Sequence, residues 1–209
     1  DGSDQHLDLL AHHYGHSGNL EKKRRYLGQA GAAAQAAYAN AAAIDYFERL
    51  APLVDRKERI EVLLKLGKVL EVVGGWRRAE QVAGEALSIA AELDDDHWRA
   101  ACETALAEVA RKQGRYDEAF ERLDRAARYF ESLGEVAGVG QVLHLVGTVA
   151  AQRGNYAKAV ESYEASLAIR QRLGDKASMA ALLSNLGIVA EYRGDYERSR
   201  GFHERALAL

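Results

Sequence analysis

The sequence repeats every 40 residues from residue 55 onward, and this period constrains the fold more than any other feature. Each copy contains a glycine, an aromatic ring two positions later and a small residue three positions after the ring. A further small residue follows seven positions on. Seven positions before the glycine lies a Gly or Ala, and a Leu or Val directly precedes it. The glycines are Gly74, Gly114, Gly154 and Gly194, the rings are Trp76, Tyr116, Tyr156 and Tyr196, the small residues are Ala79, Ala119, Ala159, Ser199, Ala86, Ala126, Ser166 and Ala206, and the early positions are Gly67, Ala107, Gly147 and Gly187.

Each position of the repeat has a physical role in a pair of helices. A glycine at a helix end accepts the left-handed conformation that releases the chain into a turn. Asn155 and Asp195, which follow two of the glycines, are suited to cap the next helix. The ring is expected to fill the corner between the helices, and the small residues allow close crossings. Further breaks are expected near residues 94, 134 and 174. Each unit is therefore predicted to hold two helices of roughly 16–18 residues.

The rest of the composition favours an all-α protein. The chain has a single proline, Pro52, and lacks the alternating Val, Ile and Thr runs of strands. In the first third, helices are expected over residues 7–14, 20–30, 32–37 and 41–54, which would form two degenerate pairs. The prediction is about twelve helices in six antiparallel pairs, with residues 1–54 as degenerate pairs and residues 55–209 as four units (55–94, 95–134, 135–174 and 175–209).

The repeat resembles the tetratricopeptide repeat, in which a Leu-Gly pair is followed by a ring and small residues. The resemblance is carried most fully by the last copy, with Leu186, Gly187, Tyr196 and Ala206. It implies a right-handed α-α superhelix that binds proteins. The period of 40 and the missing closing proline make it similar to the extended repeats of kinesin light chains, spindle-orientation adaptors and bacterial regulatory ATPases. Residues 9–14 and 26–31 resemble a segment of multidomain bacterial proteins that carry a signalling ATPase, often behind an adenylate cyclase domain.

By the same resemblance, the first helix of each unit lines the concave, partner-binding wall. The position where chaperone-binding relatives hold the Asn of a carboxylate clamp is occupied by Lys68, Glu108, Thr148 and Ile188, which argues against a chaperone cofactor. The residues expected on the concave wall are Lys65, Lys68, Glu108, Arg111, Lys112, His144, Thr148, Gln152, Ser184, Asn185, Ile188 and Tyr192.

Motifs for chemistry are sparse in this sequence. His12 and His16 lie four residues apart, a spacing that could hold a metal ion, but no carboxylate or cysteine is placed to complete the site. Gly134, Gly138 and Gly140 lack the Lys-Ser/Thr of a phosphate-binding loop. We therefore expect no cofactor, no metal and no enzymatic activity.

Charge and cysteine content restrict the partners. A net charge of −3 gives no general attraction to nucleic acid or acidic membranes, and no stretch is long and apolar enough to cross a bilayer. A single cysteine, Cys102, fits a reducing, cytoplasmic compartment.

These observations predict a non-catalytic scaffold that binds a protein or an extended peptide, as a regulatory module of a larger bacterial signalling protein. The partner could be another domain of the parent chain. The alternative is a small-molecule sensor module of a signalling ATPase. Ala206 and Leu207 lie on a face that a following helix would cover, so the parent chain is expected to continue beyond residue 209. In this fragment, a homodimer through the uncapped C-terminal end is expected.

Overall fold

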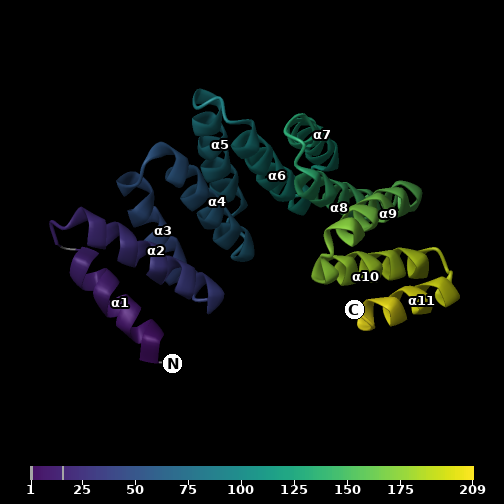
Figure 1. Ribbon diagram of the computed structural model, residues 1–209, viewed down its shortest axis with the longest axis horizontal. Coiled ribbons are helices and arrows are strands. Elements are labelled where there is room, and N and C mark those ends of the chain that lie inside the picture. The colour runs from purple at the N-terminus through teal and green to yellow at the C-terminus, as the bar shows by residue number, and fades with distance from the viewer. Residues whose placement is uncertain (1, 16) are drawn as a thin grey trace. The chain divides into compact units, whose positions relative to one another are not determined.

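The computed structural model describes residues 2–15 and 17–209, with side chains from residue 7 onward, and their regular secondary structure is helical throughout. This confirms the all-α prediction. The helices follow one another as hairpins along the chain (Figure 1). They are α1 (Gly2–Gly15), α2 (Leu20–Ala36), α3 (Asn40–Leu50), α4 (Arg56–Val72), α5 (Trp76–Glu92), α6 (Asp96–Lys112), α7 (Tyr116–Ser132), α8 (Val136–Gln152), α9 (Tyr156–Leu173), α10 (Lys176–Tyr192) and α11 (Tyr196–Leu207), with a short 3₁₀ turn at Ala51–Leu53.

The 40-residue period of the sequence is also the period of the helices. The first helices of the four units begin at Arg56, Asp96, Val136 and Lys176. The second helices begin at the four rings of the repeat. All of these helices have 17 or 18 residues except α11, which has 12. The predicted helix lengths are therefore confirmed up to α11.

The turns explain why glycine recurs in the repeat. Gly154 has a φ of +83°, and beyond it the Asn155 amide donates to the carbonyl of Ala150 (2.8 Å). This bond and that from Gly154 to Ala151 (3.0 Å) make the Schellman closure of α8. The Asn155 side chain then accepts from the amide of Lys158, which caps α9 as predicted.

Small residues lie where the helices cross, as expected. Ala79, Ala119 and Ala159 are completely buried, and Ser199 is 3% exposed. The rings of the repeat behave less uniformly. Trp76, Tyr116 and Tyr156 are half-buried, whereas Tyr196 is 72% exposed because the last helix of the structure packs on one side only.

The N-terminal third differs from the prediction at Gly31. A break was expected there, but α2 continues through it to Ala36. A Cβ at Gly31 would lie only 2.7 Å from the Phe47 ring of α3. The glycine therefore serves close packing against α3 and not a turn. The described residues consequently form eleven α-helices, one fewer than the expected number.

The chain divides into two compact units, one up to Val109 and one from Ala110, and the boundary falls inside α6. The first unit holds a core around Phe47, Ile60 and Leu70, to which Cys102 belongs. Burial raises the pKa of the Cys102 thiol to about 12, so it stays protonated at neutral pH. The division at residue 54 rests on the repeat pattern and remains a prediction.

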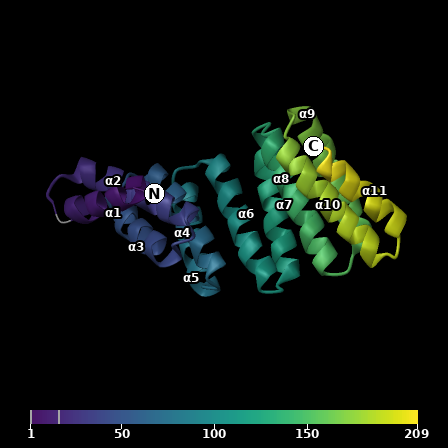
Figure 2. The ribbon, with the colours of Figure 1, turned by 90° about the horizontal axis from the view of Figure 1, so that it is seen from below.

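The second unit contains the two complete helix pairs α8/α9 and α10/α11, seen from another direction in Figure 2. Its core includes Ala150, Tyr163, Leu182 and Leu186. Helices α8 and α10 are each the first helix of a unit, the position predicted to line the partner-binding wall.

Candidate functional site

A groove of about 390 Å³ lies between α8 and α10 in the second unit, with α9 contributing two tyrosines. Residues four apart on α8 and three or four apart on α10 share a helix face, which explains how these positions converge. Five of the lining residues were predicted from the sequence, and they are Thr148, Gln152, Asn185, Ile188 and Tyr192.

One side of the groove is fixed by a chain of polar contacts. The amide nitrogen of Asn185 lies 2.9 Å from Nε2 of His144, and it donates when that ring nitrogen is unprotonated. The Tyr163 hydroxyl donates to Thr148 Oγ1 (3.2 Å), and the Thr148 hydroxyl donates to the backbone carbonyl of His144 (3.0 Å). The His144 and Tyr163 rings meet edge to face at 5.8 Å. These contacts join α8 to both α9 and α10 at the groove.

Tyr163 was not among the predicted site residues. It reaches the groove from α9 because Gly147 leaves room for its ring, since a Cβ at Gly147 would lie 2.6 Å from two ring carbons. The side chain is 3% exposed, and this burial raises the pKa of the Tyr163 phenol. The sequence does pair a large residue, Tyr163, with a glycine, Gly147. That pairing becomes meaningful only when the two helices are known to pack against each other.

An aromatic pair stands at the mouth of the groove. The rings of Tyr156 and Tyr192 stack with an interplanar angle of 5° and a centroid separation of 5.7 Å. Tyr192 is 69% exposed, so much of its surface is open to a ligand. Tyr156 was predicted from the sequence as a corner residue only, and the structure places it in the groove as well.

A cation lies beside the groove. Arg111, at the end of α6, donates to the side-chain oxygen of Gln152 (3.1 Å). Arg111 is thereby held next to the lining residues, within the same unit.

The remaining predicted residues are not part of this groove. Lys65 and Lys68 are exposed on α4 in the first unit, where Lys65 pairs with Glu61 (2.9 Å). Glu108 also belongs to the first unit, and Lys112 is exposed near the end of α6. Ser184 donates to the Ala180 carbonyl of its own helix (3.0 Å). Their role as partner contacts stays a prediction.

The metal candidate is only half within the described part of the chain. His12 lies on α1, whereas His16 is outside the described residues. Among the residues that the structure describes, no three His, Cys, Asp or Glu side chains are grouped so that they could hold a metal ion. In the same part of the chain, no helix combines the length and the apolar character needed to cross a membrane.

The groove is chemically suited to neutral, hydrogen-bonding chains. The Gln152 oxygen accepts from Arg111, so this side chain presents chiefly its N–H donors, and the Asn185 amide nitrogen lies against His144, so this side chain presents chiefly its carbonyl acceptor. These are the groups that complement the backbone of an extended peptide. Ile188 and the tyrosine pair add apolar surface beside them.

Several solved structures share this architecture. The crystal structure of BtubC (BKLC) from P. vanneervenii is 20% identical, with a TM-score of 0.76, 99% of this chain covered and 86% of that chain. A Rap protein complexed with Competence and Sporulation Factor is 18% identical, with a TM-score of 0.79 over 90% of this chain and 53% of its own. A Rap conjugation gene regulator of the plasmid pLS20, in complex with the Phr* peptide, is 16% identical with a TM-score of 0.80, over 91% of this chain and 54% of its own.

These likenesses establish the fold, and the chain spans about half the length of the two Rap proteins. No curated protein sequence matches the chain. The sequence profile described as "Tetratricopeptide repeat" matches residues 58–132 and 138–209, which together make up well over half of the chain. With the 40-residue helix pairs and their glycine turns, this match shows that the chain belongs to the tetratricopeptide repeat family.

Proposed function

We propose that this protein is a non-catalytic scaffold that binds an extended peptide segment of a protein partner in the groove between α8 and α10. The observation that carries the proposal is the convergence of two amides, Gln152 and Asn185, with the exposed Tyr192 in one groove. Amides satisfy the donors and acceptors of a peptide backbone, and an exposed ring supplies apolar contact.

The properties of the groove favour a peptide over a small molecule. Small-molecule sites bury most of their ligand's surface. Here Tyr192 is 69% exposed and Ile188 is 44% exposed, so the groove is open along α10. The sensor alternative therefore has less support than the peptide. Two of the similar Rap proteins were solved in complex, one with Competence and Sporulation Factor and one with the Phr* peptide, and this supports the same choice.

The charges around the groove indicate the kind of peptide. The lining residues carry no formal charge, and Arg111 is a cation bonded to one of them, Gln152. We therefore propose a largely neutral segment with one acidic group facing Arg111. A cytoplasmic, regulatory role in a bacterial signalling protein is part of the same proposal.

A peptide array tests this function. Fluorescently labelled protein is applied to an array of random peptides of about ten residues, and the retained sequences are measured by fluorescence anisotropy. Asn185→Ala and Tyr192→Ala are each expected to weaken binding by about tenfold or more, as the loss of a central contact does. Arg77→Ala, an exposed change on α5 in the first unit, is the matched control and should leave affinity unchanged.

The array also distinguishes the alternatives. Peptides that bind Asn185→Ala and Tyr192→Ala as tightly as the unchanged protein would place the site elsewhere. Retention of no peptide at all would contradict the proposed function.

A further inference from the structure

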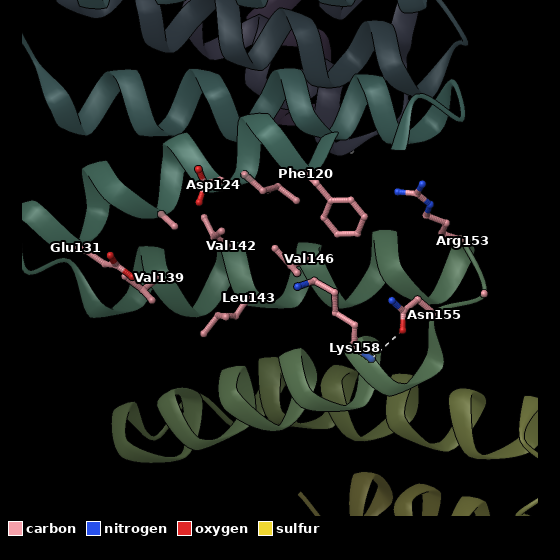
Figure 3. A pocket seen from close by; sticks show the side chains of 13 residues that line it. Phe120, Asp124, Glu131, Val139, Val142, Leu143, Val146, Arg153, Asn155 and Lys158 are labelled. Atoms are coloured by element: carbon pink, nitrogen blue, oxygen red, sulfur yellow. Dashed lines mark hydrogen bonds between the residues drawn. The ribbon is translucent and has the colours of Figure 1, made fainter. Parts of the chain in front are cut away.

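A second and larger groove, of about 700 Å³, lies in the second unit on other faces of the same helices. It is bounded by α7, α8 and α9, and Figure 3 shows its lining side chains. The floor is apolar and includes Phe120, Val142, Leu143 and Val146. None of these residues lines the groove between α8 and α10.

The repeat shows that this hollow is not a necessary consequence of the fold. Forty residues later, the corresponding position between α9, α10 and α11 has a cavity of only about 160 Å³. At three positions the residues of the large groove are smaller, whereas Phe120 is larger than the corresponding Val160. Ala127, Val142 and Val146 line the large groove, and the same positions of the next unit hold Leu167, Leu182 and Leu186.

The two ends of the large groove carry opposite charges. Asp124 and Glu131 of α7 lie toward one end, and Arg153 and Lys158 lie toward the other (Figure 3). The Lys158 side chain extends over the apolar floor, with its ammonium 6.0 Å from the centre of the Phe120 ring.

Two of these charges have exposed ion-pair partners. Asp124 pairs with Arg128 on α7, and Arg153 pairs with Asp117. Exposed pairs of this kind contribute little and exchange readily, so the charges at the two ends remain able to act on a ligand.

The dimensions correspond to a short helix. At about 1.5 Å per residue, the lining of α8 from Val139 to the following Arg153 spans roughly 21 Å. A helix of about 14 residues has this length. A helix carries partial positive charge at its N-terminus and partial negative charge at its C-terminus. Its N-terminus therefore suits the Asp124 and Glu131 end, and its C-terminus suits the Arg153 and Lys158 end.

We propose that this groove binds one amphipathic helix of a partner protein, lying antiparallel to α7 and α9. Its apolar stripe, with residues at i, i+3 or i+4 and i+7, occupies the space above Val142 and Val146. Basic residues of the partner's first turn face Asp124 and Glu131, and acidic residues of its last turn face Lys158. This surface is separate from the peptide groove of the proposed function.

Two synthetic peptides of about 14 residues test the orientation. Both carry the same leucine stripe and the same composition. The first has lysines in its first turn and glutamates in its last turn, and the second has these charges exchanged. The second peptide is the better helix on its own, because its charges complement its dipole. We expect the first to bind the full chain at least about fivefold more tightly by fluorescence anisotropy, so intrinsic helicity cannot explain the preference.

Three variants make the test specific. Ala127→Leu with Val146→Leu installs the side chains of the next unit, and it should reduce binding of the first peptide about tenfold or more. We call the Ala127→Leu/Val146→Leu protein the filled variant. Lys158→Glu, an exposed change, should remove or reverse the preference between the peptides, and this test does not depend on whether the filled variant folds. Tyr192→Ala should leave both affinities unchanged, which separates this surface from the peptide groove.

Several outcomes would overturn the proposal. Equal binding of the two peptides, or binding that the filled and Lys158→Glu variants leave intact, would exclude the proposed docking. Dodecanoate binding that only the filled variant abolishes, without peptide binding, would assign the groove to a small amphiphile. Self-association that only the filled variant abolishes would assign it to a second copy of the chain.

Discussion

Replacing Gly147 by alanine tests the close helix packing on which the candidate site depends. A Cβ at Gly147 would lie 2.6 Å from Cδ1 and Cε1 of Tyr163 and 3.0 Å from its Cγ. Tyr163 is 3% exposed and bonded to Thr148, so its ring has little freedom to move away. Adding a methyl group to a tightly packed interior costs about 1–3 kcal/mol. Replacing a helical glycine by alanine returns about 1 kcal/mol, so we expect a net destabilisation of up to about 2 kcal/mol.

The repeat supplies a matched control at Gly67, which occupies the same position two units earlier. A Cβ there would meet Val82 Cγ2 at 3.5 Å and the Ala79 carbonyl at 3.9 Å, which are ordinary contacts. Gly67→Ala should therefore stabilise the protein by about 0.5–1 kcal/mol through helix propensity alone. The same substitution at the same position of the repeat is thus predicted to have opposite signs.

Urea denaturation measures both effects. Circular dichroism follows the whole chain, and fluorescence of Trp76 and Trp98, the two tryptophans of the sequence, follows the first unit. Tyr163→Leu combined with Gly147→Ala installs the residue types of the preceding unit, which holds Ala107 and Leu123. This double variant should recover part of the lost stability. If Gly147→Ala proves as stable as the unchanged protein, or if Gly67→Ala destabilises, the size-matching argument is refuted.

Three further predictions concern packing, capping and association. Ala159→Leu should destabilise by about 1–3 kcal/mol because Ala159 is completely buried at a helix crossing, and an unchanged thermal midpoint would contradict this. Asp95→Ala should cost about 1 kcal/mol at neutral pH, because the carboxylate accepts from the Trp98 amide at the start of α6. Lys57 holds the pKa of the Asp95 carboxyl below its usual value, so this stabilisation is present above the unfolded pKa and lost as pH falls below about 4. The difference between Asp95→Ala and the unchanged protein should shrink accordingly in acid titrations, and a constant difference would refute the linkage. Leu207 is 89% exposed on α11, so we expect light scattering to show self-association that Leu207→Glu abolishes, whereas a monomer at high concentration would refute it.

The candidate site was only partly predictable. The sequence placed Thr148, Gln152, Asn185, Ile188 and Tyr192 on the helices that form the groove between α8 and α10, because residues three or four apart share one helix face. It did not identify Tyr163, which belongs to the second helix of its unit. The contribution of Tyr163 depends on the absence of a side chain at Gly147.

The sequence by itself determined the local structure and the family. A 40-residue period with a glycine after the first helix of each unit sets the helix lengths, the turns and the pairing, because capping and left-handed turns are properties of neighbouring residues. The same local rules could not interpret Gly31, where a glycine expected to break a helix instead packs against Phe47.

Only the tertiary structure decided which surfaces are hollow. The large groove beside α7 is lined by Ala127, Val142 and Val146, which are smaller than the leucines found 40 residues later. Neither the three smaller residues nor the three leucines look unusual within their own helices, since each group keeps the apolar pattern of a buried face. The space appears when side chains from three helices are brought together, because packing depends on the summed volumes of residues distant in the chain.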